Sequence, residues 1–313
     1  MIEFLAVFLV CYVYHALGIT IGYHRMLSHR AFATPKWVEY FWVLAGYLAF
    51  EGSPIWWCTI HRAHHRHVDT PLDPHSPRHG LQNAWFGWLT EKGYAPHVSP
   101  ERQAKDLLKD PIYRFLEFGG SWAKAHTFTF TVGFLFRAAI WAYFGWVPAL
   151  ASLLAGLAVL QIPLMLNVIC HIPKFGYKSY AVEDDSVNVW WVGLLACGEG
   201  WHNNHHASPS SAKTGMHTWK DFDLSWQLIK VMRSLGLATR VNEFNHEEMV
   251  RKAEIVRKSA ALRLQTAPTV LPTVGTESIN SEVDCTPGCG NEALEAALAA
   301  SAHRPARAVA KAS

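Results

Sequence analysis

Three stretches of the chain stay apolar for long enough to cross a lipid bilayer. Residues 2–23 are apolar apart from one Glu and one His, residues 125–146 are interrupted by Arg137, and residues 147–169 carry no charge. A transmembrane helix needs about 20 predominantly apolar residues. The pattern therefore predicts three membrane-spanning helices. We expect Arg137 to point inward, because a charged side chain is costly where it faces lipid.

The second and third of these stretches predict a helical hairpin. Only the uncharged segment 145–148 separates them, so the hairpin tip should lie on the far side of the membrane. Eight Lys or Arg residues lie between positions 61 and 120, and the tip has none. Cytoplasmic loops carry the excess of basic residues. We therefore expect 61–120 to be cytoplasmic, and 171–250 to lie on the same side.

A fourth apolar stretch, 37–60, has a different character. It contains Glu51, Gly52 and Pro54, which indicate a broken element. If polar groups on both sides of it form one site, it cannot cross the membrane. It then dips in and returns, or it lies in the interface.

The last part of the chain changes composition. Residues 243–264 are charged and are compatible with a surface helix, and from about 267 the sequence is rich in Ala, Thr, Ser and Pro. Such composition is typical of a flexible tail. We expect a membrane domain over 1–250, followed by a C-terminal helix and tail over 251–313.

Composition agrees with a membrane protein. Half of the 313 residues are apolar and only 17% are charged, which is a low share for a soluble protein. The net charge of +3 is too small to indicate a nucleic-acid partner. The fold class expected is an all-α integral membrane protein. It would have three to four transmembrane helices and a cytoplasmic helical cap.

The 18 histidines carry the chemistry, because eight of them form three groups. The groups are His24 with His29, His61 with His64 and His65, and His202 with His205 and His206. On a helix, positions i, i+3 and i+4 share one face, so each triplet projects its imidazoles in one direction. A spacing of five is about 140° on an α-helix. We therefore expect His24 to end the first span and His29 to follow on bent backbone.

A ninth histidine, His171, follows the uncharged span 147–169. Asn167 lies one helical turn before His171, where its side chain can hold a metal-bound water. Eight or nine imidazoles exceed the four ligands of a tetrahedral zinc site. They suit two metals of four to five nitrogens each. Imidazole accepts Zn, Cu, Fe or Ni, so the ligands alone leave the metal open, with copper the main rival to iron.

The three groups resemble the histidine boxes of membrane fatty acid desaturases, specifically the acyl-CoA Δ9 (stearoyl-CoA) type. The similarity covers roughly residues 10–235. It includes Ala16-Leu17-Gly18-Ile19-Thr20 before the first box, Asp73-Pro74-His75 after the second, and Gly198-Glu199-Gly200-Trp201 before the third, besides Asn167 and His171.

The resemblance implies two iron ions. One would take His24, His29, His61, His65 and His205. The other would take His64, His171, His202 and His206, with Asn167 through a water. It also implies that Asp69, Asp73 and Glu199 accept hydrogen bonds from the ligand N–H groups.

The activity implied is an O₂-dependent desaturation that puts a cis double bond, at Δ9 in this type, into a long-chain acyl-CoA or acyl lipid. Arg62, Trp57 and Trp201 are candidate substrate contacts. The sequence has no flavin, dinucleotide or iron–sulfur motif. The electrons should therefore come from a separate ferredoxin- or cytochrome b5-type donor with its reductase.

The chain departs from the family pattern in two ways. Family members usually have one more span before the helix that ends at the first box, so this chain either has three spans with its amino terminus outside or starts before Met1. It also has no fused cytochrome b5 domain with a His-Pro-Gly-Gly motif.

Three alternatives have different consequences. A membrane hydroxylase with the same metal site would yield an alcohol. A metal transporter or sensor should place its ligands near mid-membrane rather than at the cytoplasmic helix ends. A bis-histidine haem protein needs isolated His pairs on facing spans.

Overall fold

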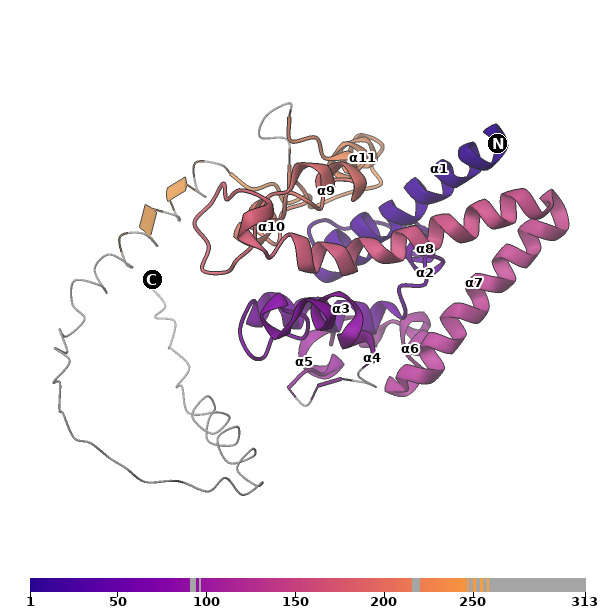
Figure 1. Cartoon of the computed structure of the whole chain (residues 1–313), viewed down its shortest axis with the longest axis horizontal. Coiled ribbons are helices and arrows are strands. Elements are labelled where there is room, and N and C mark those ends of the chain that lie inside the picture. The colour runs from indigo at the N-terminus through magenta and orange to yellow at the C-terminus, as the bar shows by residue number, and fades with distance from the viewer. Residues whose placement is uncertain are drawn as a thin grey trace, which may run out of the picture. The chain divides into compact units, whose positions relative to one another are not determined.

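The computed structural model describes residues 1–90, 94–95, 97–215 and 220–245, and isolated positions from 247 to 258. These residues are predominantly helical (Figure 1). Among them, only isolated β-bridges join extended segments, for example Ala33 to Thr239.

Three helical segments are long and apolar enough to cross a membrane, as the sequence predicts. The first runs over Ile2–Ser28, and the others are α7, Trp122–Phe144, and α8, Trp146–Ile169. Figure 1 shows α7 and α8 as a hairpin, and α1, Ile2–Leu17, packs against α8. The hairpin turn is tighter than expected. Only Gly145 separates the two helices, with a φ of 89° that a glycine adopts without strain.

Arg137 of α7 faces inward, as expected, and is 4% exposed. Its guanidinium donates to the carbonyl of Gly133 at 3.0 Å and lies 3.3 Å from His15 Nε2. It also lies over the ring of Phe50, 4.8 Å from the centroid. Carbonyl, imidazole and aromatic partners therefore replace a carboxylate around this buried cation.

The apolar stretch 37–60 contains two short helices. They are α2, Lys36–Tyr47, and α3, Pro54–His67, of 12 and 14 residues. Neither reaches the length that a bilayer crossing needs. In the segment between them Phe50 and Gly52 have φ values of 68° and 79°, so the backbone reverses there. Ser53 then caps α3 by accepting from the N–H of Trp56.

The first span continues beyond α1 as a π-helix, η1, over Gly18–Ser28. The prediction that His24 ends this span is wrong. In a π-helix the hydrogen bonds join residues five apart, and the N–H of His29 donates to the carbonyl of His24 at 3.1 Å. The wider turn brings residues with a spacing of five to the same side. The separation of about 140° between His24 and His29 holds for an α-helix and not for this π-helix.

Shorter helices complete the part that holds the histidines. Their bounds are α4 Trp88–Thr90, α5 Pro100–Gln103, α6 Pro111–Glu117, α9 Trp190–Leu195, α10 His202–Ala207 and α11 Leu224–Ser234. Single turns of 3₁₀ or π-helix lie at Pro77–His79, Asn83–Gly87, Leu107–Lys109, Phe118–Gly120 and Pro173–Phe175. The main apolar core joins η1, α2, α3 and α11.

The C-terminal segment predicted at 251–313 falls mostly outside the described residues. Of its positions, only Arg251, Glu254, Ile255 and Lys258 are described, and they are helical. The expected flexible tail lies entirely outside the described part of the chain.

Candidate metal centre

Five histidines from three separate elements converge on one point. They are His24 and His29 at η1, His61 and His65 of α3, and His205 of α10, and their ligand atoms all lie within 4.8 Å of one another. The Nε2 atoms face each other at 2.8 Å between His29 and His61 and at 2.9 Å between His65 and His205. The π-helix of η1 lets the first pair contribute from one end of a single helix.

Four further histidines converge on a second point. They are His64, His171, His202 and His206, and their ligand atoms also lie within 4.8 Å of one another. The Nε2 atom of His202 lies 3.0 Å from that of His171 and 3.0 Å from that of His206. His64 and His65 are neighbours on α3, so the two clusters are adjacent. The structure thus brings together all nine histidines that the sequence singled out, in the two sets that the resemblance implies.

Carboxylates surround the clusters and hold the outer nitrogen of four rings. His24 Nδ1 lies 2.7 Å from Glu199, and His64 Nδ1 lies 3.0 Å from both oxygens of Asp73. These two acids, like Asp69, lie where the sequence analysis expects N–H acceptors. The contacts fix the ring orientation and place the proton on Nδ1, which leaves Nε2 free to bind a metal.

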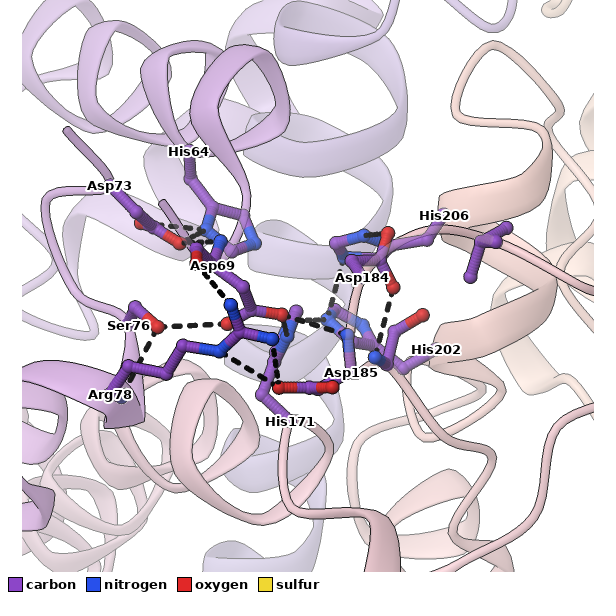
Figure 2. A network of polar contacts seen from close by, with 12 residues as sticks. His64, Asp69, Asp73, Ser76, Arg78, His171, Asp184, Asp185, His202 and His206 are labelled. Carbon is purple, nitrogen blue, oxygen red and sulfur yellow. Dashed lines mark hydrogen bonds and ion pairs between the residues drawn. The ribbon is translucent and has the colours of Figure 1, made fainter. Parts of the chain in front are cut away.

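Figure 2 shows the corresponding contacts around the second cluster. His171 Nδ1 lies 3.1 Å from Asp69, and His206 Nδ1 lies 3.1 Å from Asp184. Asp69 also accepts from the hydroxyl of Ser76. The sequence analysis did not single out Asp184. It belongs to a run of three acids, 183–185, and nothing in their spacing distinguishes the one that reaches a histidine.

A buried ion-pair network supports Glu199. The Arg25 guanidinium, 1% exposed, donates to Glu199 at 3.0 Å and to Asp223 at 3.0 Å. Burial alone would raise the pKa of Glu199, but Arg25 and His24 lower it below its usual range. The carboxylate therefore stays charged and can accept from His24.

Burial favours the neutral form of six of the nine imidazoles. Burial lowers the pKa of each of His29, His61, His65, His202, His205 and His206 well below its usual value, and the neighbouring rings lower it further. A neutral imidazole is the form that binds a metal.

The inward-facing nitrogens fit a cation and not one another. In the second cluster three rings have Nδ1 at a carboxylate, so their Nε2 atoms are acceptors, and the single N–H of His202 can serve at most one of them. The Nε2 atom of His64 is buried and has no hydrogen-bond partner. Buried acceptors without donors are costly. A metal ion at each convergence point would satisfy these lone pairs.

A cavity of about 520 Å³ reaches the metal centre. His24, His61, His202 and Asn167 line it, and most of the other lining side chains are apolar or aromatic. Asn167 lies one turn before His171 on α8 and is 9% exposed. Asn167 and His202 both line the cavity, which is compatible with the water-mediated contact expected from the sequence.

The two predicted tryptophan contacts differ in position. Trp57 lines the cavity and donates from Nε1 to Glu51 at 3.2 Å. Burial raises the pKa of Glu51 well above its usual value, which favours the neutral form of this carboxyl group. Trp201 is 1% exposed, does not line the cavity, and donates to the carbonyl of Phe222. Its indole packs against Gly193 instead.

Arg62 forms hydrogen bonds within the protein through its whole guanidinium group. Its five N–H donors go to the carbonyls of Leu27, Ser28 and Gln103 and to both carboxylate oxygens of Asp106, at 2.6–3.0 Å. The guanidinium therefore ties the end of η1 to the segment that follows α5. The role of Arg62 as a substrate contact stays a prediction, although these bonds use all five of its N–H donors.

The sequence model of the family described as Fatty acid desaturase matches residues 2–231. A sn-1 stearoyl-lipid 9-desaturase of Anabaena variabilis is 38% identical, covering 74% of this chain and 81% of that protein. Delta-9 acyl-lipid desaturase 1 of Arabidopsis thaliana is 38% identical, covering 81% and 79%. An acyl-CoA 5-desaturase of Anemone leveillei is 39% identical, covering 76% and 70%.

Proposed function

The chain belongs to the fatty acid desaturase family, and we propose that it puts a cis double bond at Δ9 of a long-chain saturated acyl group, using two iron ions held by the nine histidines. The observation that carries this proposal is the pair of imidazole clusters, three of whose histidines line a mainly apolar cavity.

The reaction removes two hydrogen atoms from adjacent methylenes. With two electrons and two protons from a donor, these reduce one O₂ to two waters, and a C=C bond remains. No side chain can break an unactivated C–H bond, so the bound iron would supply the O₂ chemistry. The donor would be a ferredoxin- or cytochrome b5-type protein with its reductase.

The chain's own residues would position and shield this chemistry. The carboxylates of Glu199, Asp73, Asp69 and Asp184 would each hold one imidazole ring with its Nε2 toward the metal. The walls of the cavity, with Trp57 among them, would keep the acyl chain beside the irons and exclude water. Asn167 would orient a water at the second cluster.

Two finer points belong to the same proposal. The Δ9 position follows two of the relatives, whereas the Anemone leveillei relative is named a 5-desaturase, so regiochemistry needs its own test. The metal centre would lie on the cytoplasmic face, as the basic residues of 61–120 predict.

The test is expression in a host whose lipids lack the product, followed by mapping of double bonds. We expect a new Δ9 monoene with the wild-type chain and none with His64→Ala or His205→Ala. His79→Ala, at an exposed histidine outside both clusters, is the matched control and should keep the product. A hydroxylated acyl chain in place of the monoene would contradict a desaturase. A Δ5 product would contradict only the regiochemistry.

Purified protein provides a second readout. We expect about two iron ions per chain by elemental analysis, with zinc and copper absent in stoichiometric amount. Stoichiometric copper would contradict the iron assignment directly.

A further inference from the structure

We infer that the ring of Phe50 closes the end of the cavity between α7 and α8, that Arg137 holds the ring there, and that this pair limits the length of the acyl chain. The inference rests on the proposed function, because it names a specificity-determining residue and a positioning residue for that reaction.

The cavity follows α8 away from the metal centre. Its lining residues on this helix run from Asn167, one turn before His171, back to Leu160, which is about 10 Å along the helix axis. On α7, which runs in the opposite direction, the lining residue nearest to the hairpin turn is Phe130. The structure describes all residues between Phe130 and Leu160, and none of them lines the cavity. The cavity therefore ends at the level of these two side chains.

Phe50 fills the space at this level. Its ring stacks on that of Phe130 with 5.1 Å between centroids, and the residue is 2% exposed. A Cβ at Gly133 of α7 would overlap the ring, and a Cβ at Gly156 of α8 would lie 3.4 Å from it. The two glycines thus form a notch that admits the ring between the helices. Because Phe50 also lines the cavity, its ring is the surface that closes this end.

Arg137 holds the ring from the side of the hairpin turn. Its guanidinium carbon lies 4.8 Å from the centroid of Phe50, and a buried cation is attracted to an aromatic face. The guanidinium is fixed in turn, since Nη1 donates to the carbonyl of Gly133 at 3.0 Å and Nη2 lies 3.3 Å from His15 Nε2. Arg137 does not line the cavity, so it acts on the substrate only through Phe50.

The backbone at Phe50 shows that its position is imposed by its surroundings. Its φ is 68°, a left-handed conformation that bulky residues rarely adopt. Such strain persists only where the surrounding structure over-determines it, and it is concentrated at functional sites. The contacts with Phe130, Arg137 and the glycine notch supply that constraint.

A ring at this end would meet the methyl end of the acyl chain. The methyl end has no polar group to recognise, so only its reach along the cavity can distinguish one saturated chain from another. One methylene more or less in an apolar pocket changes specificity by about 10-fold or more. Removal of the ring should therefore let longer chains bind with the same methylenes beside the metal centre.

The experiment expresses full-length Phe50→Ala in the host used above, supplied with equal amounts of palmitic, stearic and arachidic acid. We expect the ratio of unsaturated arachidoyl to unsaturated stearoyl chains to rise about 10-fold over wild type, with unchanged iron content. Phe144→Ala, at a 73% exposed phenylalanine of α7 that does not line the cavity, is the matched control and should keep the wild-type ratio. If Phe50→Ala does not fold, Phe50→Leu replaces it, with a smaller rise expected.

Arg137 is tested by the same ratio. Arg137→Met has a neutral side chain of similar length, and we expect it to shift the ratio in the same direction because the ring loses the cation beside it. Arg137→Lys keeps a cation and should restore part of the wild-type ratio. Lower iron content and lower total turnover at an unchanged ratio would show a merely structural role and overturn the assignment of Arg137.

Binding without turnover gives an independent readout. A ligand that binds only the folded protein raises the midpoint of thermal unfolding. With purified full-length protein in nanodiscs, we expect stearic acid to raise the midpoint more than arachidic acid does for wild type, and the two acids to act equally on Phe50→Ala.

An unchanged product ratio in Phe50→Ala with normal iron content would overturn this inference and leave the desaturase proposal standing. Absence of an unsaturated product from every chain would overturn the proposed function. The order of the thermal midpoints would then decide by itself whether Phe50 closes the cavity, since it needs no turnover.

Discussion

Asp184 accepts a hydrogen bond from His206 Nδ1 at 3.1 Å, although 22 residues separate the two in the chain. Asp185, the next residue, has a different role. Its side chain forms an exposed ion pair with Arg78 at 2.7 Å, and its backbone N–H donates to Asp69. Asp184 and Asp185 can therefore be compared directly. Only the side chain of Asp184 contacts a histidine of the metal centre.

We expect Asp184→Ala to lower metal affinity or activity by about 10- to 100-fold, because the His206 ring loses the acceptor that fixes its orientation. Asp184→Asn, which keeps an acceptor oxygen, should recover part of the loss. Asp185→Ala should change neither, since an exposed ion pair contributes under about 1 kcal/mol. Metal content and turnover measure the effect. Equal losses for the alanine variants at 184 and 185 would contradict the role of Asp184.

Acid should release the metal and destabilise the fold. Burial lowers the pKa of the clustered imidazoles, such as His202 and His206, below the ordinary value of 6.5. Above pH 6.5 both folded and unfolded chains hold these rings neutral. As the pH falls below 6.5, only the unfolded chain takes up protons, so stability falls by up to about 1.4 kcal/mol per pH unit for each such histidine.

The measurement is metal content and the midpoint of thermal unfolding between about pH 5 and pH 8. We expect both to be level above pH 7 and to fall together below 6.5. The exposed-histidine variant His79→Ala should follow the wild-type curve. A midpoint that stays level down to pH 5 would contradict the assignment of buried, neutral rings.

Close packing of η1 on α2 should tolerate no side chain at Gly18. A Cβ there would lie 2.6 Å from Ala45 Cβ and would also clash with the backbone of Gly46. The φ of Gly18 is −59°, so alanine meets no backbone strain and any cost comes from packing. We expect Gly18→Ala to destabilise the protein by about 1–3 kcal/mol and to reduce metal content by displacing η1.

Gly22→Ala provides the graded control for this prediction. Its Cβ would lie 3.0 Å from backbone atoms of Trp42, a tight contact that a small shift can relieve. Its loss of thermal midpoint should therefore be the smaller of the two. An equal or larger loss at Gly22 would contradict the conclusion that the closer contact of Gly18 with Ala45 and Gly46 sets the cost.

The sequence predicts correctly those elements that depend on residues close together in the chain. The three spans follow from runs of apolar residues, and the triplets at 61–65 and 202–206 follow from helical spacing. The π-helix at Gly18–Ser28 could not be predicted in this way, because the residues there also suit an α-helix and only tertiary packing favours the wider turn.

Roles that depend on distant partners were also beyond sequence reasoning. Arg62 and Trp201 lie beside histidine boxes, which made a substrate role plausible for both. Their polar atoms are instead satisfied by the carbonyls of Leu27, Ser28 and Gln103 for the arginine and of Phe222 for the tryptophan. These partners are far away in the chain, so composition and spacing carry no signal for them.

Arg62 also gives the last test, because structural and substrate roles predict opposite kinetics. If its guanidinium ties η1 to the segment after α5, then Arg62→Lys removes several charge-assisted hydrogen bonds and leaves buried carbonyls unpaired. We expect a destabilisation of about 2–3 kcal/mol and a lower iron content, with KM for the acyl substrate unchanged in the fraction that keeps iron. Arg66→Ala, at an exposed arginine of the same helix, should leave all three quantities at wild-type values. A raised KM with normal stability and iron content would instead assign Arg62 to the substrate.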